Sequence, residues 1–249
     1  MNGHNGVRTR EAALAGLMVL ILAGAAACSG DSAKKNDVSK SDSVAASVKT
    51  LPDPVPPAVA GVGHHAENAY DAAKIGNWAY GTATVDSLRA VVGQLPDSTS
   101  TELAKLGSLR DTLGVTLGML EKAMSSRDST RAMHAANRIT ELGARLSEPY
   151  GPSTPVGVTL LDFYGRELEL WGGTSAKTAD EKLRDVAASI RRTWDATRPQ
   201  LLAKGGEKEA ARFDSLAVRV GSAKTRAEYV GLSALILDQV DNLEKVFNR

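Results

Sequence analysis

The sequence predicts an all-α fold, an up-and-down antiparallel bundle of seven or eight helices, in residues 58–249. Apolar residues recur there at three- and four-residue steps with charged residues on the opposite face, which is the pattern of an amphipathic helix. No stretch alternates apolar and polar residues long enough to predict a strand. Glycine and proline separate the periodic stretches, and the short connections favour antiparallel neighbours in a bundle.

The helix starts and ends can be placed from capping residues and helix breakers. The expected helices cover residues 60–75, 78–94, 100–125, 129–146, 157–171, 178–203, 207–220 and 226–247. Three starts fit the capping-box pattern, in which a threonine is followed three residues later by a glutamate: Thr99, Thr178 and Thr225. The helix count stays open at Gly76 and Asn77. Either these residues end one helix and cap the next, or the two helices run on as one.

The densest break divides the predicted domain near its middle. Residues 149–155 contain three prolines, and they separate candidate halves at 58–147 and 156–249. Each half would hold four helices, with a tryptophan on the second one (Trp78 and Trp194). The pattern raises the hypothesis that the two halves are structurally related.

The first 27 residues have the organisation of a secretory signal peptide. Arg8 and Arg10 precede an uncharged run of 16 residues, 12–27, which is shorter than the roughly 20 residues of a membrane-spanning helix. The run ends in small residues before Cys28, the only cysteine in the chain. Cleavage before Cys28 is the prediction, and a retained transmembrane anchor is the alternative.

Residues 20–29, Leu-Ile-Leu-Ala-Gly-Ala-Ala-Ala-Cys-Ser, resemble the lipobox of bacterial lipoproteins. The resemblance implies that Cys28 becomes the new N-terminus and carries acyl chains such as palmitate. Two or three chains on one residue make a stable membrane anchor, so the protein is expected in the cell envelope. Ser29 at the second mature position implies the outer membrane, at its periplasmic face or at the cell surface, if the source has two membranes.

Residues 28–57 are expected to form a disordered tether behind the acylated cysteine. Aspartate and lysine alternate there with Ser, Val and Pro, and such a composition buries too little apolar surface to fold. A flexible segment of this length has a reach of roughly 30 Å. The tether would let the helical domain stand off the membrane, and its proline-rich end is an alternative partner-binding motif.

Composition and motifs exclude several classes of function. The chain has 30 basic and 29 acidic residues spread evenly, and 4% aromatic residues, so it lacks the charge pattern of a nucleic-acid binder. The GxSxG, HExxH and GxxxxGK motifs do not occur. Residues 61–66 match a loose GxGxxG/A string, but they open a helical region rather than a βαβ unit. We expect no enzymatic activity and predict no cofactor.

His64 and Glu67 are the candidate metal ligands. They are three residues apart on the first helix, a spacing at which imidazole and carboxylate converge on one ion in bundle metal sites. The segment is similar to the GxHxxE motif of imelysin-type proteins, which are helical envelope proteins associated with iron uptake. Val62 stands where that motif has glycine. The resemblance implies a site for iron, another divalent ion such as copper or zinc, or a small ligand. The alternative is an ordinary solvated helix face.

Two further groups of polar residues lie on the predicted helices. His134, Asn137 and Glu141 lie away from the apolar stripe of the fourth helix, so we expect them to face water. Tyr164, Arg166 and Glu167 follow the central break and are candidates to line a cleft between the halves. The alternative is a stripe of core residues between the halves, made of Leu161, Tyr164, Leu168 and Trp171.

Two functions therefore follow from the sequence. The first is a membrane-anchored envelope lipoprotein whose non-catalytic bundle binds an envelope protein partner or has a structural role. The second is a metal-binding or small-ligand-binding lipoprotein of imelysin-like character, with His64 and Glu67 in its site.

Overall fold

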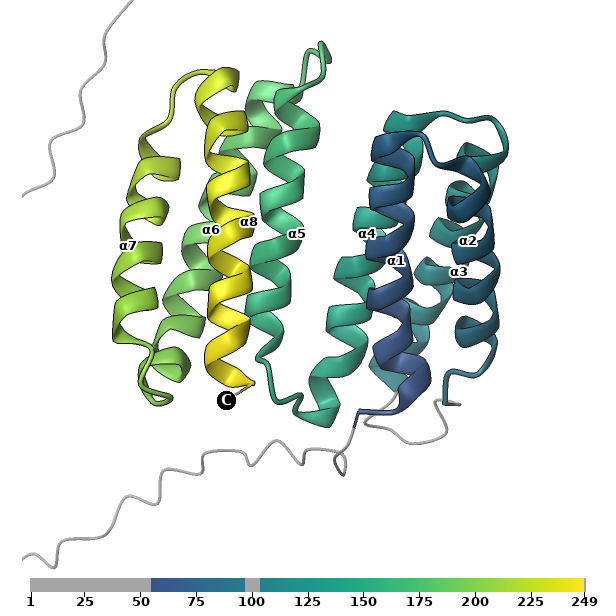
Figure 1. Ribbon diagram of the computed structural model, residues 1–249, viewed down its shortest axis with the longest axis horizontal. Helices are drawn as coiled ribbons and strands as arrows, with labels where there is room; N and C mark the ends of the chain where they lie inside the picture. The colour runs from purple at the N-terminus through teal and green to yellow at the C-terminus, as the bar shows by residue number, and fades with distance from the viewer. Residues whose placement is uncertain (1–54, 97–103, 249) are drawn as a thin grey trace, which may run out of the picture. The chain divides into compact units, whose positions relative to one another are not determined.

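The structure, a computed structural model, describes residues 55–96 and 104–248, and all the elements in these ranges are helical (Figure 1). The helices are α1 (Pro57–Ile75), α2 (Trp78–Gly93), α3 (Ala104–Ser125), α4 (Ser129–Ser147), α5 (Val156–Gly172), α6 (Ala179–Leu202), α7 (Glu207–Ser222) and α8 (Arg226–Phe247), with a short 3₁₀ helix, η1 (Glu148–Tyr150), after α4. The all-α prediction is confirmed. The predicted signal peptide and Cys28 lie outside the described residues, as does nearly all of the predicted tether.

Helices α1–α4 form one four-helix set around their own core. The neighbouring pairs are α1–α2, α2–α3, α3–α4 and α1–α4, which is the order of an up-and-down bundle. Leu88, Leu113, Leu120, Ile139 and Leu142 are fully buried in its core. Removing one such leucine side chain typically costs about 2–5 kcal/mol of stability.

Helices α5–α8 form a second four-helix set with a separate core. The same four neighbour relations occur, together with a smaller contact between α6 and α8. Trp194 and Phe213 pack against each other at its centre, with tilted rings whose centroids are 4.5 Å apart. Helix α5 packs against α4, so the two sets meet along what we call the seam. In Figure 1 the first set runs from blue to teal and the second from green to yellow.

The two predicted tryptophans do not occupy equivalent places in the two sets. Trp78 is the first residue of α2 and is only partly buried, whereas Trp194 lies deep within α6 and is fully buried. A structural relationship between the halves therefore rests on the shared order of helix packing and stays a hypothesis.

Capping residues decide where several helices begin and end. Gly76 adopts φ 72°, a left-handed conformation that ends α1, and the Asn77 side chain accepts a hydrogen bond from the backbone N–H of Tyr80. The first two helices are therefore separate. Thr225 and Glu228 form the predicted capping box at α8.

The capping box predicted at Thr178 is wrong. Thr178 has φ −86° and ψ −3° and makes no capping hydrogen bond through its side chain. A capping residue needs a non-helical backbone so that its side chain can reach back to the first turn, and this backbone is already helical. The box predicted at Thr99 lies outside the described residues.

None of the described helices is both long enough and apolar enough to cross a membrane.

Candidate functional site

The two predicted metal ligands point to different surroundings. His64 is exposed, and its Nε2 atom lies 3.1 Å from Asn68 Nδ2. Glu67 is partly buried, and charged groups of α5 and α8 act on its pKa. No group of three or more His, Cys, Asp or Glu side chains is placed to hold a metal ion within residues 55–96 and 104–248. The structure thus adds no third ligand to this pair.

Glu67 belongs instead to a charged cluster at the seam, which we call the seam cluster: Glu67 of α1, Asp162 and Arg166 of α5, and Glu244 of α8. Burial raises the pKa of Glu67 from 4.5 to about 7, because the charged carboxylate loses water. The neighbouring Asp162, Glu244 and Asp71 raise this pKa further, and Arg166 opposes them.

Arg166 is the central cation of the seam cluster. Its side chain is only 12% exposed, and its Nη2 atom lies 3.2 Å from Asp162 Oδ2, so the ion pair predicted from the i, i+4 spacing is present. Its guanidinium also lies over the ring of Tyr70 on α1, 5.0 Å from the centroid. This cation–π contact joins α5 to α1.

Hydrogen bonding within the cluster is incomplete. Asp162 Oδ2 is buried and meets Arg166 Nη2 only as an ion pair, without a hydrogen bond, and Arg166 Nη1 is buried without a hydrogen-bond partner, although such atoms are nearly always hydrogen-bonded in proteins. Burial also raises the pKa values of Asp162 and Glu244, and Asp241 raises both further as a nearby like charge. Burial and like charges thus raise the pKa values of carboxyl groups on three helices, which favours uptake of a proton.

A second polar contact joins α4 to α5 through Glu167. Its Oε1 atom accepts a hydrogen bond from Asn137 Nδ2 at 2.8 Å, and its Oε2 atom accepts one from Trp171 Nε1 at 2.7 Å. Asn137 also donates to the backbone carbonyl of Phe163 at 3.2 Å. Arg166 and Glu167 therefore both lie at the seam. Tyr164, in contrast, packs against the core of the second helix set.

The prediction that Asn137 and Glu141 face water is wrong. Asn137 is fully buried and Glu141 is nearly so, with its carboxylate held by Arg138 and Arg145. Helix α4 packs against α1, α3 and α5, so more than its apolar stripe is covered. His134 is partly exposed and packs against the ring of Trp171, with centroids 5.2 Å apart.

The predicted stripe of core residues also lies elsewhere. Leu161 and Leu168 are buried in the core of the second set, and Tyr164 and Trp171 pack against that core. This face of α5 turns mainly toward α6 and α8, although Trp171 at its end also contacts His134 of the first set. The residues of α5 that reach across the seam are mainly polar, and the apolar side chains of Leu170 and Trp171 accompany them.

Glu169 makes a third polar contact across the seam. Its carboxylate accepts a hydrogen bond from the Tyr70 hydroxyl at 3.2 Å and pairs with Lys74 at 2.6 Å. A hollow of about 400 Å³ lies beside this contact, lined by Tyr70, Thr130, Met133, Glu169, Leu170, Gly173, Thr174 and Ser175. Its charged group is already paired across the seam, so the hollow offers no free charge to a ligand.

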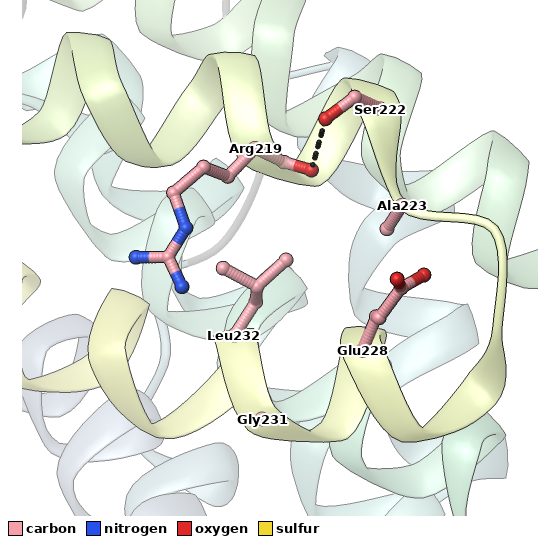
Figure 2. Close-up of a pocket in the computed structure, with 6 residues that line it drawn as sticks. All are labelled: Arg219, Ser222, Ala223, Glu228, Gly231 and Leu232. Atoms are coloured by element: carbon pink, nitrogen blue, oxygen red, sulfur yellow. Dashed lines mark hydrogen bonds between the residues drawn. The ribbon is translucent and has the colours of Figure 1, made fainter.

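Figure 2 shows another hollow, of about 370 Å³, where α7 ends and α8 begins. Two of its polar side chains, those of Glu228 and Ser222, already have structural partners. Glu228 accepts hydrogen bonds from the backbone N–H groups of Lys224 and Thr225, and Ser222 donates to the carbonyl of Arg219. We assign this hollow to the capping of α8.

The most exposed apolar side chains of the first set's outer helices lie on α3. Val115 and Met119 are one turn apart and each is 61% exposed. Gly114 and Gly118 flank them, and a Cβ atom at either glycine would meet nothing within 4 Å. We call these four residues the α3 ridge. Sequence reasoning missed it, although both large residues lie off the leucine stripe that marks the buried face of α3.

Two exposed charged residues of α3 lie on the same face as the α3 ridge: Asp111, one turn before Val115, and Lys122, three residues after Met119. Helix α2 beside it carries only Asp86 and Arg89, which pair with each other at 2.8 Å, while Arg89 also pairs with Glu121 of α3. The other exposed residues of α2 are uncharged: Ala79, Tyr80, Thr82, Ala83, Ser87, Ala90 and Gly93.

Comparisons with protein-family models, with curated proteins and with solved structures found no match. The functional proposals therefore rest on the residues and contacts of the chain itself.

Proposed function

We propose that this protein is a lipid-anchored lipoprotein of the bacterial cell envelope whose helical domain has no catalytic role and binds a protein partner through the α3 ridge. The observation that carries the proposal is the exposure of Val115 and Met119, two large apolar side chains one turn apart on the outer face of α3. Protein-binding patches are apolar at their centres and depleted in charged residues.

The shape of the α3 ridge indicates the kind of partner. Two large side chains one turn apart can insert between the side chains of a facing helix. The open glycines beside them leave room for a backbone to come close. The centre of the α3 ridge is apolar, and its edge carries one anion, Asp111, and one cation, Lys122. The matching surface is therefore a helix face of an envelope protein that is apolar at its centre.

The lipid anchor is supported by the sequence alone. Small residues precede the single cysteine after an apolar run, and the segment that follows is polar and proline-rich. This order of segments supports a folded domain carried at a distance from a membrane. The domain would meet partners in the same membrane or just beneath it.

A crosslinking experiment tests the docking surface. A photo-activatable amino acid is placed at Met119 in the full chain, expressed in envelope-containing cells, and in a matched chain at Val218 of α7, which is 62% exposed. We expect one discrete adduct with another protein at position 119, reduced when Val115→Lys is added, and no such adduct at position 218. Equal adducts at both positions, or an adduct that is a dimer of this chain, would contradict the proposal.

The anchor has a separate test. The Cys28→Ser variant should lose lipid labelling and move from the detergent phase to the aqueous phase, because the variant lacks the thiol that receives the lipid. Ser29→Ala is the matched control and should stay labelled. Membrane association that persists unchanged in Cys28→Ser would point to a transmembrane anchor instead.

A further inference from the structure

Large apolar side chains gather at the turn between α1 and α2. Ile75, the last residue of α1, is 76% exposed, and Tyr80 in the first turn of α2 is 50% exposed. Trp78 lies between them in the sequence, packs against the first core and is still partly exposed. Three large side chains within six residues therefore meet solvent at one end of the first helix set.

The turn between α3 and α4 lies beside this turn and adds exposed cations. The Ser129 hydroxyl donates a hydrogen bond to the backbone carbonyl of Ala73 at 2.8 Å, and both turns are at the top of the first set in Figure 1. Arg127 and Arg131 are exposed there, and the Arg131 side chain is 82% exposed. We call this end of the first set the tip: Ile75, Trp78, Tyr80, Arg127 and Arg131.

The charge around the tip is positive. Asp128 accepts the capping hydrogen bond from the backbone N–H of Arg131, and Lys74 pairs with Glu169 across the seam. The Arg127 side chain has no ion-pair or hydrogen-bond partner in the part of the chain that the structure describes. Residues 72–82 and 122–132 together hold four cations and one anion: Lys74, Lys122, Arg127 and Arg131 against Asp128.

We propose that the tip is a membrane-contact site, which places Ile75, Trp78 and Tyr80 in the interface of an anionic lipid bilayer. Tryptophan and tyrosine concentrate at this depth because their rings are apolar and carry one polar group. Arginine and lysine beside them are attracted to acidic lipids, and such a surface binds through buried apolar area together with this attraction. The proposal does not rest on the lipid anchor or on the α3 ridge.

The size and charge of the tip favour a lipid surface over a protein partner. A stable protein interface takes about 800 Å² from each partner, whereas the tip offers three large apolar side chains on one turn. A protein would also have to supply a carboxylate at one fixed place for Arg127. A bilayer of acidic lipids presents phosphate groups over its whole surface, so it needs no matched shape.

A fluorescent label that responds to its surroundings tests the tip in the full chain. In a Cys28→Ser background, which removes the only natural cysteine, the label is attached at Ala79→Cys or at Ser87→Cys. Both positions are exposed on α2, and they are about 12 Å apart along the helix. With vesicles that contain phosphatidylglycerol, we expect the emission at position 79 to rise, shift to shorter wavelength and be quenched by spin-labelled lipids. The emission at position 87 should not change.

Variants show which side chains carry the insertion, read as the lipid dependence of the emission at position 79. Ile75→Ser/Tyr80→Ser should weaken insertion at least about tenfold, because it removes apolar area. Arg127→Gln should weaken it about fivefold, because one cation near an anionic surface contributes about that much. Vesicles of phosphatidylcholine alone should bind more weakly than those with phosphatidylglycerol. Residues 12–27 are the same in every chain, so they do not alter these comparisons.

Two matched controls separate the tip from other exposed surfaces. Val115→Ser changes a side chain of the α3 ridge that is 61% exposed, and Arg212→Gln removes an exposed cation of α7. Each should leave insertion within about twofold of the parent. Equal emission changes at positions 79 and 87, or insertion that Ile75→Ser/Tyr80→Ser leaves unchanged, would overturn the proposal. An unchanged emission at position 79 with both kinds of vesicle would also overturn it and would leave a protein as the partner of the tip.

Discussion

The outer helices of the two sets, α2–α3 and α6–α7, hold corresponding places in the packing order but differ in their exposed chemistry. Helices α2 and α3 carry few charges and expose alanine, glycine, Val115 and Met119. Helices α6 and α7 are densely charged, at Asp180, Glu181, Lys182, Arg184, Asp185, Arg191, Arg192, Asp195, Arg198, Glu207, Lys208, Glu209, Arg212, Asp214 and Arg219. Packing requires apolar residues only on the buried face, so the fold does not dictate this difference.

The exposed face of the first set is therefore a better guide to function than its core. A charged surface such as that of α6 and α7 keeps a helical domain soluble. A surface of small and apolar residues does not serve that purpose and is typical of contact with another protein.

The largest expected effects come from the cores, where the two sets should behave alike. Leu120→Ala in the first core and Leu183→Ala in the second each remove a fully buried side chain. Each should lower the free energy of unfolding by about 2–5 kcal/mol, measured by urea denaturation. If one substitution cost as little as a surface change, the two sets would not be comparable folding units.

The next largest effect is a pH dependence of stability, which we expect from the seam and not from either core. The shifted pKa of Glu67 predicts that stability falls between pH 4.5 and about 7, because the folded state binds the extra proton in this range. The free energy of unfolding should fall by about 2 kcal/mol over this range. This loss is smaller than the full pKa shift would give, because the carboxyl group is partly exposed to solvent.

Glu67→Gln should flatten this part of the stability profile, and Glu181→Gln should leave it unchanged. The measurement is denaturation across the same pH range. A slope that survives in Glu67→Gln would assign the proton uptake to another group.

A smaller effect tests the capping difference between α6 and α8. Thr225→Ala removes the side-chain acceptor for the N–H of Glu228 and should cost about 1 kcal/mol. Thr178→Ala should cost less than about 0.5 kcal/mol, because Thr178 makes no capping hydrogen bond. Thermal denaturation of both variants compares them directly, and equal losses would contradict the assignment of the caps.

The sequence predicted the helices well because their signals are local. Gly76 and Asn77 separate α1 from α2, and the capping box at Thr225 marks the start of α8. The prediction at Thr178 failed because the backbone conformation, rather than the residue type, decides whether a threonine caps a helix. Asn137 was misplaced because an apolar stripe reveals one buried face, while α4 is covered on several.

The seam cluster could be predicted only in parts. The Asp162–Arg166 pair follows from i, i+4 spacing on one helix. Its effect on the pKa of Glu67 does not, since that effect depends on how α1 and α5, which are distant in the sequence, are placed in the fold. The α3 ridge could have been predicted from the sequence, because Val115 and Met119 lie opposite the leucine stripe of a predicted helix. Whether a partner covers it depends on a second molecule.

Substitutions in the α3 ridge should change stability least of all. They should change the binding of a partner most. Val115→Lys/Met119→Lys alters two exposed side chains, so the free energy of unfolding should change by less than about 0.5 kcal/mol. Val218→Lys on α7 is the matched control, since Val218 is equally exposed.

The measurement that tests the account most directly is the affinity of the crosslinked partner, once purified, for these two variants and the parent. A docking surface at the α3 ridge predicts a rise in Kd of at least about tenfold for Val115→Lys/Met119→Lys. Val218→Lys should leave the Kd within about twofold of the parent. An unchanged Kd for the double variant, or an equal loss of affinity for Val218→Lys, would contradict the assignment of the α3 ridge as the docking surface.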